Sequence, residues 1–432
     1  MMIGSYIAKP KHLFTYLEAL RPANLLGPLE HLWQLGLVKK HSDVWPSLVL
    51  WNDDVAFDSN VMTSLQAFAK YYKVVEVHDI ENLQSLNPQS FDPSTEWHMY
   101  SHTTRMIDTW QEWTSLRVTR WQWNLCRNAL DLARSSFLAA LPQLSYLSSL
   151  SLMVQDSTLL EAVLAFASNS RELIELRLDC FLTQRLSVTT EMLQNVIRWF
   201  ERKPVRMFKF SSWNTRPTDP AVRQIFYRVV FGCPTLDELV CLWTDLNDMD
   251  FTDIQLHMRS LVLHRCNLGS DNLSALADRL PGSSMTHLAV KALENDNFSG
   301  LERLLQVLPS SSIKDLDLSG SYIEQAAWFS LAPLLSSCRL ESLVLVNTSL
   351  FSDQIELIAR AIQDNGTISR LDCSRNPLDV QGARCLIESA THSTRPIHMR
   401  LLYLIDSFNI SHAGRDELKQ LADQRGLNHF YI

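Results

Sequence analysis

The sequence predicts an α/β solenoid with a parallel inner sheet, outer helices and a helical cap at the N-terminus. Three observations lead to this fold class: a short apolar motif recurs about every 28 residues, apolar and polar residues alternate within it, and an amphipathic run follows several of its copies. One such unit cannot enclose a hydrophobic core, but stacked units bury a continuous one. We therefore expect each unit to add one strand and one helix to an array.

The clearest copy of the motif begins at Leu340, and the next begins at Ile368. Period-2 alternation places Leu343 and Leu345 on one face of a strand. The strand must then bend, and a short buried polar side chain can bond the backbone groups that a bend leaves unpaired. Thr348 and Asn376 occupy this position in the two copies. Apolar residues at positions i, i+3, i+4 and i+7 then predict an amphipathic helix over 354–362.

Both copies fit L-x-x-L-x-L-x-x-(N/C/T)-x-L, which resembles the strand motif of leucine-rich repeats. In the second half of the chain, copies of this motif begin at residues 258, 285, 313, 340, 368, 399 and 427, with spacings of 27 to 31 residues. Units of this length resemble the ribonuclease-inhibitor type of leucine-rich repeat, and this resemblance implies a horseshoe with helices on its convex side. The run Cys266–Leu280 also resembles the cysteine-containing repeats common in F-box proteins.

We divide the expected solenoid, residues 45–432, into an irregular part over 45–257 and a regular part over 258–432. The irregular part has expected motifs beginning at Trp45, Tyr72, Trp113, Leu147, Leu173, Val205 and Leu236. The segment 87–102 interrupts this rhythm with a turn-rich loop. The acidic segment 245–251 is too short for a full helix, so one unit should lack its outer helix.

Residues 1–44 lack the motif and are expected to be helical, with a helix over 29–38. The pattern Ile3-x-x-Tyr6-Ile-x-x-Pro10-x-x-Leu13-Phe14-x-x-Leu17 resembles an F-box, a helical module that docks a cullin–RING ubiquitin ligase through a small adaptor protein. This resemblance implies that Pro10, Leu13, Phe14 and Leu17 contact the adaptor. The alternative is a cap that only covers the open end of the solenoid, and the residues leave both interpretations open.

Composition excludes several classes of function. The chain is 46% hydrophobic and 20% charged, as expected for a folded protein, and its net charge of -8 disfavours a general nucleic-acid binder. No apolar run approaches the roughly 18 residues of a membrane span, and no secretory leader is evident, so we expect a cytoplasmic or nuclear protein.

Nucleotide-binding, zinc-protease and serine-hydrolase motifs are missing. His98 and His102 have no evident third ligand. We therefore expect no enzyme activity, cofactor or metal.

Strand positions between the buried leucines should face the concave side and form a ladder of side chains that binds a protein. The candidate contacts there are His264, His287, Lys291, Asp315, Asp317, Arg370 and Asp372. Trp123 and Trp243 are candidate anchors, since tryptophan is enriched at binding hot spots; core packing is an equal alternative for both. The favoured function is an F-box-like substrate receptor without catalysis, and the alternative is a repeat scaffold or inhibitor with no ubiquitin-ligase link.

Overall fold

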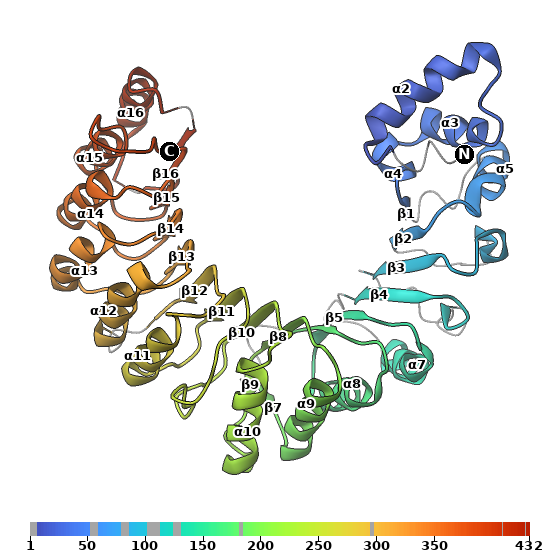
Figure 1. Ribbon diagram of the computed structural model, residues 1–432, viewed down its shortest axis with the longest axis horizontal. Helices are drawn as coiled ribbons and strands as arrows, with labels where there is room; N and C mark the ends of the chain where they lie inside the picture. Colours follow the sequence, from blue (N-terminus) through green and yellow to red (C-terminus); the bar gives the residue numbers. More distant parts are fainter. Residues whose placement is uncertain are drawn as a thin grey trace. The chain divides into compact units, whose positions relative to one another are not determined.

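The computed structural model describes residues 7–51, 59–78, 86–101, 113–123, 131–180, 185–293, 298–407, 409–427 and 429–432. The chain forms two compact units, Met1–Phe181 and Leu182–Ile432. Each unit is built from parallel strands that alternate with helices (Figure 1). This is the fold of a leucine-rich-repeat solenoid, as the motif predicts.

The first unit begins with a helical module made of α2 (Pro10–Leu20), α3 (Leu29–Val38) and α4 (His41–Val44). Proline suits the first position of α2, where no backbone donor is needed. The Phe14 ring stacks on His41 with ring centroids 3.8 Å apart, and a side chain at Gly36 would overlap that ring. The expected helix over 29–38 is confirmed, whereas Ile3 and Tyr6 lie outside the described residues.

Six strands follow in the described part of the first unit, and each pairs in parallel with the next: β1 (Leu48–Trp51), β2 (Val74–His78), β3 (Glu96–Ser101), β4 (Val118–Trp123), β5 (Ser149–Val154) and β6 (Glu175–Cys180). The helices between them include α5 (Ser59–Ala69), α7 (Asp131–Ala140) and α8 (Ser157–Asn169). Asp156 caps α8 by accepting hydrogen bonds from two backbone N–H groups of its first turn.

Two sequence predictions in this unit are corrected. The segment expected to interrupt the rhythm contains strand β3, which buries Trp97 and Met99 and places His98 on its other face. The repeat expected to start at Trp113 has a different frame, because Trp121 pairs with Leu150 and Trp123 with Leu152. The strand motif is therefore Val118-x-x-Trp121-x-Trp123. Closely spaced apolar residues allowed two frames, and the tryptophans occupy the leucine positions.

The described part of the second unit contains nine parallel strands that pair in chain order: β8 (Met207–Ser211), β10 (Glu238–Leu242), β11 (Ser260–His264), β12 (His287–Lys291), β13 (Asp315–Asp317), β14 (Ser342–Val344), β15 (Arg370–Asp372), β16 (Leu401–Tyr403) and β17 (Phe430–Tyr431). A separate two-stranded pair, β7 (Leu186–Ser187) and β9 (Trp213–Asn214), was not predicted. The register aligns the motif leucines, for example Leu316, Leu343 and Leu371.

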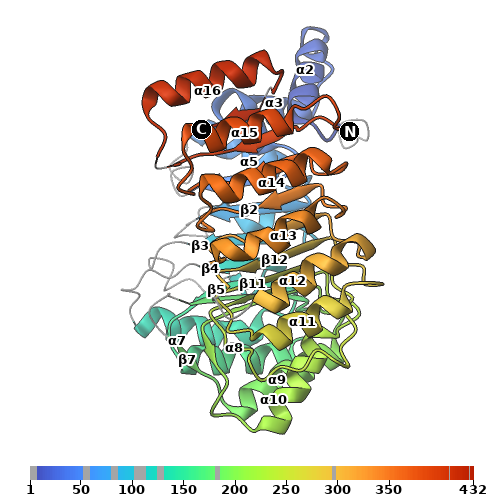
Figure 2. The ribbon, with the colours of Figure 1, turned by 90° about the vertical axis from the view of Figure 1, so that its left-hand side faces the viewer.

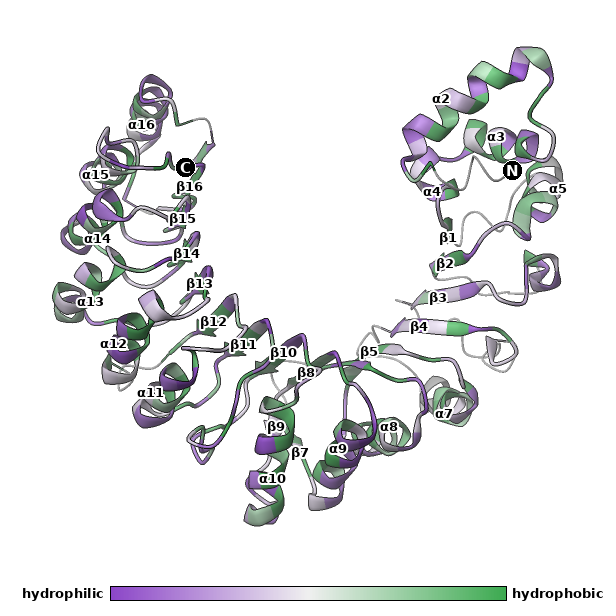
Figure 3. Cartoon of the chain, in the orientation of Figure 1, coloured by the Kyte–Doolittle hydropathy of each residue, from purple (hydrophilic) through white to green (hydrophobic). Residues whose placement is uncertain are grey.

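Helices of the second unit are α9 (Thr190–Arg202), α10 (Pro220–Phe231), α11 (Ser270–Arg279), α12 (Phe298–Val307), α13 (Trp328–Leu335), α14 (Ser352–Asp364), α15 (Val380–Ala390) and α16 (His412–Gln424). Helices α11 to α16 stack side by side on one face of the sheet (Figures 1 and 2). Hydrophobic and hydrophilic residues interleave along these strands and helices (Figure 3). All of 243–259 is described and none of it is helical, so the predicted missing helix is confirmed.

Two devices shape the bends that follow strands of the second unit, and the first, a buried polar side chain, occurs at several bends but is replaced by Trp213 after β8 and by Leu293 after β12. Buried polar residues bond the backbone of the bend, as predicted: the Asn376 side chain accepts from the N–H groups of Thr348 and Leu350 and donates to the carbonyl of Leu345. The second device was not predicted. The residue seven positions after each motif start has a left-handed backbone, and these residues are Ser212, Trp243, Arg265, Ala292, Gly320, Asn347, Arg375 and Asp406, with φ between 51° and 71°. Except at Asp406, its N–H donates to a carbonyl of the following repeat.

Candidate binding surface

The strand residues of the second unit that face away from the helices form the candidate binding surface. Parallel pairing places His264 beside Lys291, His287 beside Asp315, and both Asp317 and Asp372 beside Val344. Each of these side chains keeps part of its surface accessible, and Arg370 is exposed. The seven polar residues expected on this face therefore do lie on one face of one sheet. Whether they contact a partner stays a prediction.

Opposite charges on this surface pair with one another across the strands. Arg370 reaches past Ser342 of the intervening strand, and its Nη2 lies 2.7 Å from Oδ1 of Asp315. Lys291 pairs with Asp317. Asp317 and Asp372 also each accept a hydrogen bond of 2.9 Å from the backbone N–H two residues ahead, at Ser319 and Ser374. These carboxylates therefore support the turns after their strands as well as facing outward.

A cluster around Trp243 interrupts this pattern of paired charges. The centroid of the Trp243 indole lies 5.9 Å from the centroid of the His264 ring. The guanidinium carbon of Arg265 lies 4.3 Å from the indole centroid. Burial lowers the pKa of His264 below its ordinary value, and the positive charges of Lys291 and Arg265 lower it further, while Asp317 acts in the opposite direction. The imidazole is therefore biased toward its neutral form. Arg265 was missed because its position was assigned only to the bend.

Trp123 does not belong to a binding surface. Its side chain is 1% exposed and its ring packs 4.5 Å from that of Phe137 in the core of the first unit. Of the two interpretations left open for Trp123, the structure agrees with core packing and not with a partner anchor, because the motif frame of β4 makes it an inward-facing residue. Trp243 is only partly buried and lies at the rim of the candidate surface.

Three of the residues expected to contact an adaptor are also corrected. Leu13, Phe14 and Leu17 are at most 2% exposed, because they form the core between the helices of the N-terminal module. A fully buried side chain offers no contact area, so these three residues cannot form the proposed contact. Pro10 keeps part of its surface accessible. Among the described residues of the module, the large apolar side chains that are exposed are those of Leu25, Leu37 and Val38, at 65%, 60% and 58%.

A stack of rings in the first unit was not predicted from the sequence. Trp51, His78 and Tyr100 occupy the same register position on β1, β2 and β3, with ring centroids 4.0 and 4.6 Å apart. A similar pair, Tyr403 and Tyr431, stacks at 4.8 Å on β16 and β17 of the second unit. Outward positions of neighbouring strands could have indicated both stacks, since rings at equal register meet.

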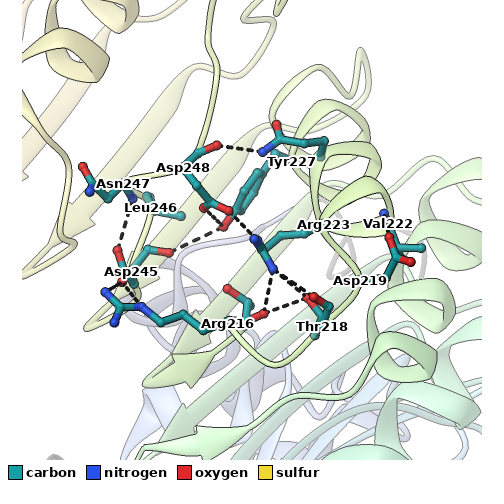
Figure 4. Close-up of polar contacts among 12 residues, drawn as sticks. Arg216, Thr218, Asp219, Val222, Arg223, Tyr227, Asp245, Leu246, Asn247 and Asp248 are labelled. Carbon is teal, nitrogen blue, oxygen red and sulfur yellow. Dashed lines mark hydrogen bonds and ion pairs between the residues drawn. The ribbon is translucent and has the colours of Figure 1, made fainter.

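A cluster of polar side chains connects the repeat that lacks an outer helix to α10 of the preceding repeat (Figure 4). Arg216 donates to Asp245 at 2.8 Å, and the Tyr227 hydroxyl donates to Asp248 at 3.1 Å. Arg223 of α10 bonds Asp248 and also donates to the carbonyl of Thr218. Burial raises the pKa of Tyr227 above its ordinary range. Each carboxylate here has a cationic partner, so the cluster holds segment 245–248 against the loop before α10 and against α10 itself.

The residues that the structure describes contain no group of three or more His, Cys, Asp or Glu side chains arranged to hold a metal ion. They also contain no helix with the length and apolar character needed to cross a bilayer. His98 lies on a strand, whereas His102 falls outside the described ranges.

Comparison with known proteins shows a distant likeness to solved structures. No protein-family model matches the chain, and no curated protein matches it significantly. Among solved structures, a chain in the crystal structure of the Rad7 and Elc1 complex in yeast is similar, with 14% sequence identity and a TM-score of 0.48. The match covers 94% of this chain and 89% of that one. At this distance, function has to be inferred from the residues of this chain.

Proposed function

We propose that the chain is a non-enzymatic protein-recognition module that binds a target protein on the outward face of the second unit's sheet. The observation that carries this proposal is the fixed register of its strands, which projects chemically varied, partly accessible side chains from a rigid backbone. Small apolar residues lie among paired charges there. Mixed charge with apolar spots suits a protein partner, because complementary charges set orientation and exclude wrong partners.

The test is a pair of charge-introducing variants on opposite sides of the same repeat. Val344 lies on β14 between Asp317 and Asp372, and Glu356 is exposed on the outer helix α14. A target is first captured on the immobilised chain and identified, and its dissociation constant is then measured with purified components. Val344→Arg should weaken binding at least about tenfold, which corresponds to about 1.4 kcal/mol. Glu356→Arg should leave it unchanged. The opposite result would place the interface on the helices.

For the N-terminal module, we propose the role of an F-box-like receptor that joins the bound target to a ubiquitin-ligase adaptor. The exposed side chains of Leu25, Leu37 and Val38 support an interaction role, because a cap has no need to present large apolar residues to solvent. The double variant Leu37→Asp/Val38→Asp should lose co-purification with a cullin–RING ligase from a eukaryotic lysate, and Glu356→Arg should retain it. If wild type recovers no ligase, the chain is a scaffold or inhibitor.

A further inference from the structure

The geometry around Trp243 points to a particular kind of partner. We propose that Val262, together with Trp243, His264, Arg265 and Lys291, forms a patch that binds an extended protein segment carrying an aspartate or glutamate beside an apolar side chain. This inference rests on the proposed function and narrows it to one part of the surface. We call these five residues the Trp243 patch.

The floor of the patch is apolar and low. Val240, Val262 and Ala289 occupy the same register position on β10, β11 and β12. Val240 and Ala289 are 8% and 1% exposed and offer a partner little or no surface, whereas Val262 between them keeps part of its surface accessible. The accessible floor is therefore the Val262 side chain, with His264 on the same face of the same strand. A floor of this size accommodates one apolar side chain of a segment that crosses the strands.

One wall of the patch is built from residues that the turn itself does not require. Trp243 and Arg265 have φ values of 56° and 51°, in the left-handed region that large side chains seldom adopt. Gly320 and Asn347 make the equivalent turn with the same type of backbone hydrogen bond. The indole and guanidinium of adjacent repeats instead stack on each other at 4.3 Å. Their presence is therefore best explained by what they offer at the surface.

Arg265 supplies a positive charge that the described part of the protein leaves uncompensated. Within the described residues, no carboxylate lies within ion-pair distance of its guanidinium, whereas Lys291 is paired with Asp317. By contrast, Arg375 at the equivalent turn position has a carboxylate partner, since its Nε lies 3.4 Å from Oδ2 of Asp406. A cation that has no carboxylate partner among the described residues favours an anionic ligand at that point of the surface. One full charge matches a single carboxylate better than a phosphate dianion.

The same residues explain how the carboxylate would be held. A guanidinium whose face rests on an indole keeps its edge N–H donors available, and these match a carboxylate with two parallel hydrogen bonds. His264 lies between Trp243 and Lys291, and burial, followed by the positive charges of Lys291 and Arg265, lowers the pKa of its imidazole. A bound anion would oppose those charges. When an aspartate or glutamate of the bound segment pairs with Arg265, the apolar side chain next to it in that segment lies over the floor of the patch.

The experiment uses the full chain and a random dodecapeptide library displayed on phage. Peptides selected on the immobilised chain are resynthesised with a fluorescent label, and their affinities are measured by anisotropy. Each is compared with a form whose acid is replaced by its amide. The protein variants are Arg265→Ala and, as the matched control, Arg375→Ala. Thermal unfolding of both variants confirms that they fold.

We expect the selected peptides to share an acidic residue beside a large apolar one. Arg265→Ala and removal of the peptide's acid should each weaken binding at least about tenfold, and combining the two should add little. Arg375→Ala should have no effect. Selection of sequences without acids, selection of no sequence, or equal binding of acidic peptides to Arg265→Ala would overturn the proposal. Tighter binding of a phosphopeptide or of an oligothymidylate through Arg265 would also overturn it.

Failure of this inference is distinguishable from failure of the proposed function. A captured target that is lost with Val344→Arg but kept with Arg265→Ala leaves recognition by the sheet face intact and removes the acidic-segment proposal. A target that is unaffected by both variants removes both.

Discussion

Asn376→Ala is the sharpest test of how adjacent repeats are joined. The Asn376 side chain is 0% exposed, and its Oδ1 accepts from the N–H groups of Thr348 at 2.9 Å and Leu350 at 3.1 Å. Removing it leaves both buried donors without an acceptor. The carbonyl of Leu345 keeps a second partner, the Thr348 hydroxyl at 2.9 Å. An unsatisfied buried donor costs about 1–3 kcal/mol, so we expect a loss of about 4 kcal/mol.

Urea unfolding followed by circular dichroism measures this loss. The matched control is Asn409→Ala, because that asparagine is exposed and makes one side-chain bond, to the carbonyl of Pro377 at 3.0 Å. The control should change the free energy of unfolding by no more than about 0.5 kcal/mol. Since repeats contact only their neighbours, Asn376→Ala should also broaden the transition. A loss below about 1 kcal/mol would refute the view that this side chain joins the two repeats.

Three further predictions address the core, the surface and a helix terminus of the same region. Leu345 is 0% exposed, so Leu345→Ala should lower the free energy of unfolding by about 2–5 kcal/mol in urea titrations. Arg370→Ala should change it by less than about 0.5 kcal/mol, because its pair with Asp315 is accessible to solvent; a larger change would show that the pair is a structural element. Asp379 caps α15, and hydrogen bonds from the Gly382 N–H and the Ser352 hydroxyl lower its pKa. Asp379→Ala should therefore cost about 1 kcal/mol at pH 7, and the difference from wild type should shrink as pH falls through the lowered pKa, below about 3.9, because protonation removes the charge-dependent part of the cap's contribution.

Most of the second unit's architecture could be predicted because each repeat has the same sequence pattern, a strand motif followed by a bend. The alternation around Leu343 and Leu345 identifies the buried face, and spacings near 28 residues leave room for a helix. Asn376 was predicted correctly as a buried polar residue because a bend leaves backbone groups unpaired, and a short polar side chain can bond them. The seven outward polar residues followed from the same alternation. Repetition corrects local ambiguity, since each copy confirms the frame of the next.

The first unit was harder because its repeats vary. Around Trp113 to Trp123 apolar residues occur at several spacings, and a frame shift turned a core tryptophan into a predicted anchor. In the N-terminal module, the F-box resemblance rested on Leu13, Phe14 and Leu17, which the fold buries. Residues that define a helical motif are often those that hold its helices together. Motif positions therefore identified the module's core, whereas its exposed residues lay elsewhere in the sequence.

The binding chemistry depends on a property that alternation does not encode, namely which outward side chains meet across strands. Arg370 meets Asp315 two strands away, and Lys291 meets Asp317 on the next strand, so four of the predicted contact residues neutralise one another. Arg265, in the turn after the strand, has no carboxylate within ion-pair distance among the described residues. Its stacking on Trp243 requires consecutive left-handed turns in two repeats, one of which lacks a helix. Recognition in this chain is thus expected to depend on turn residues that depart from the repeat, because the regular strand positions largely satisfy each other.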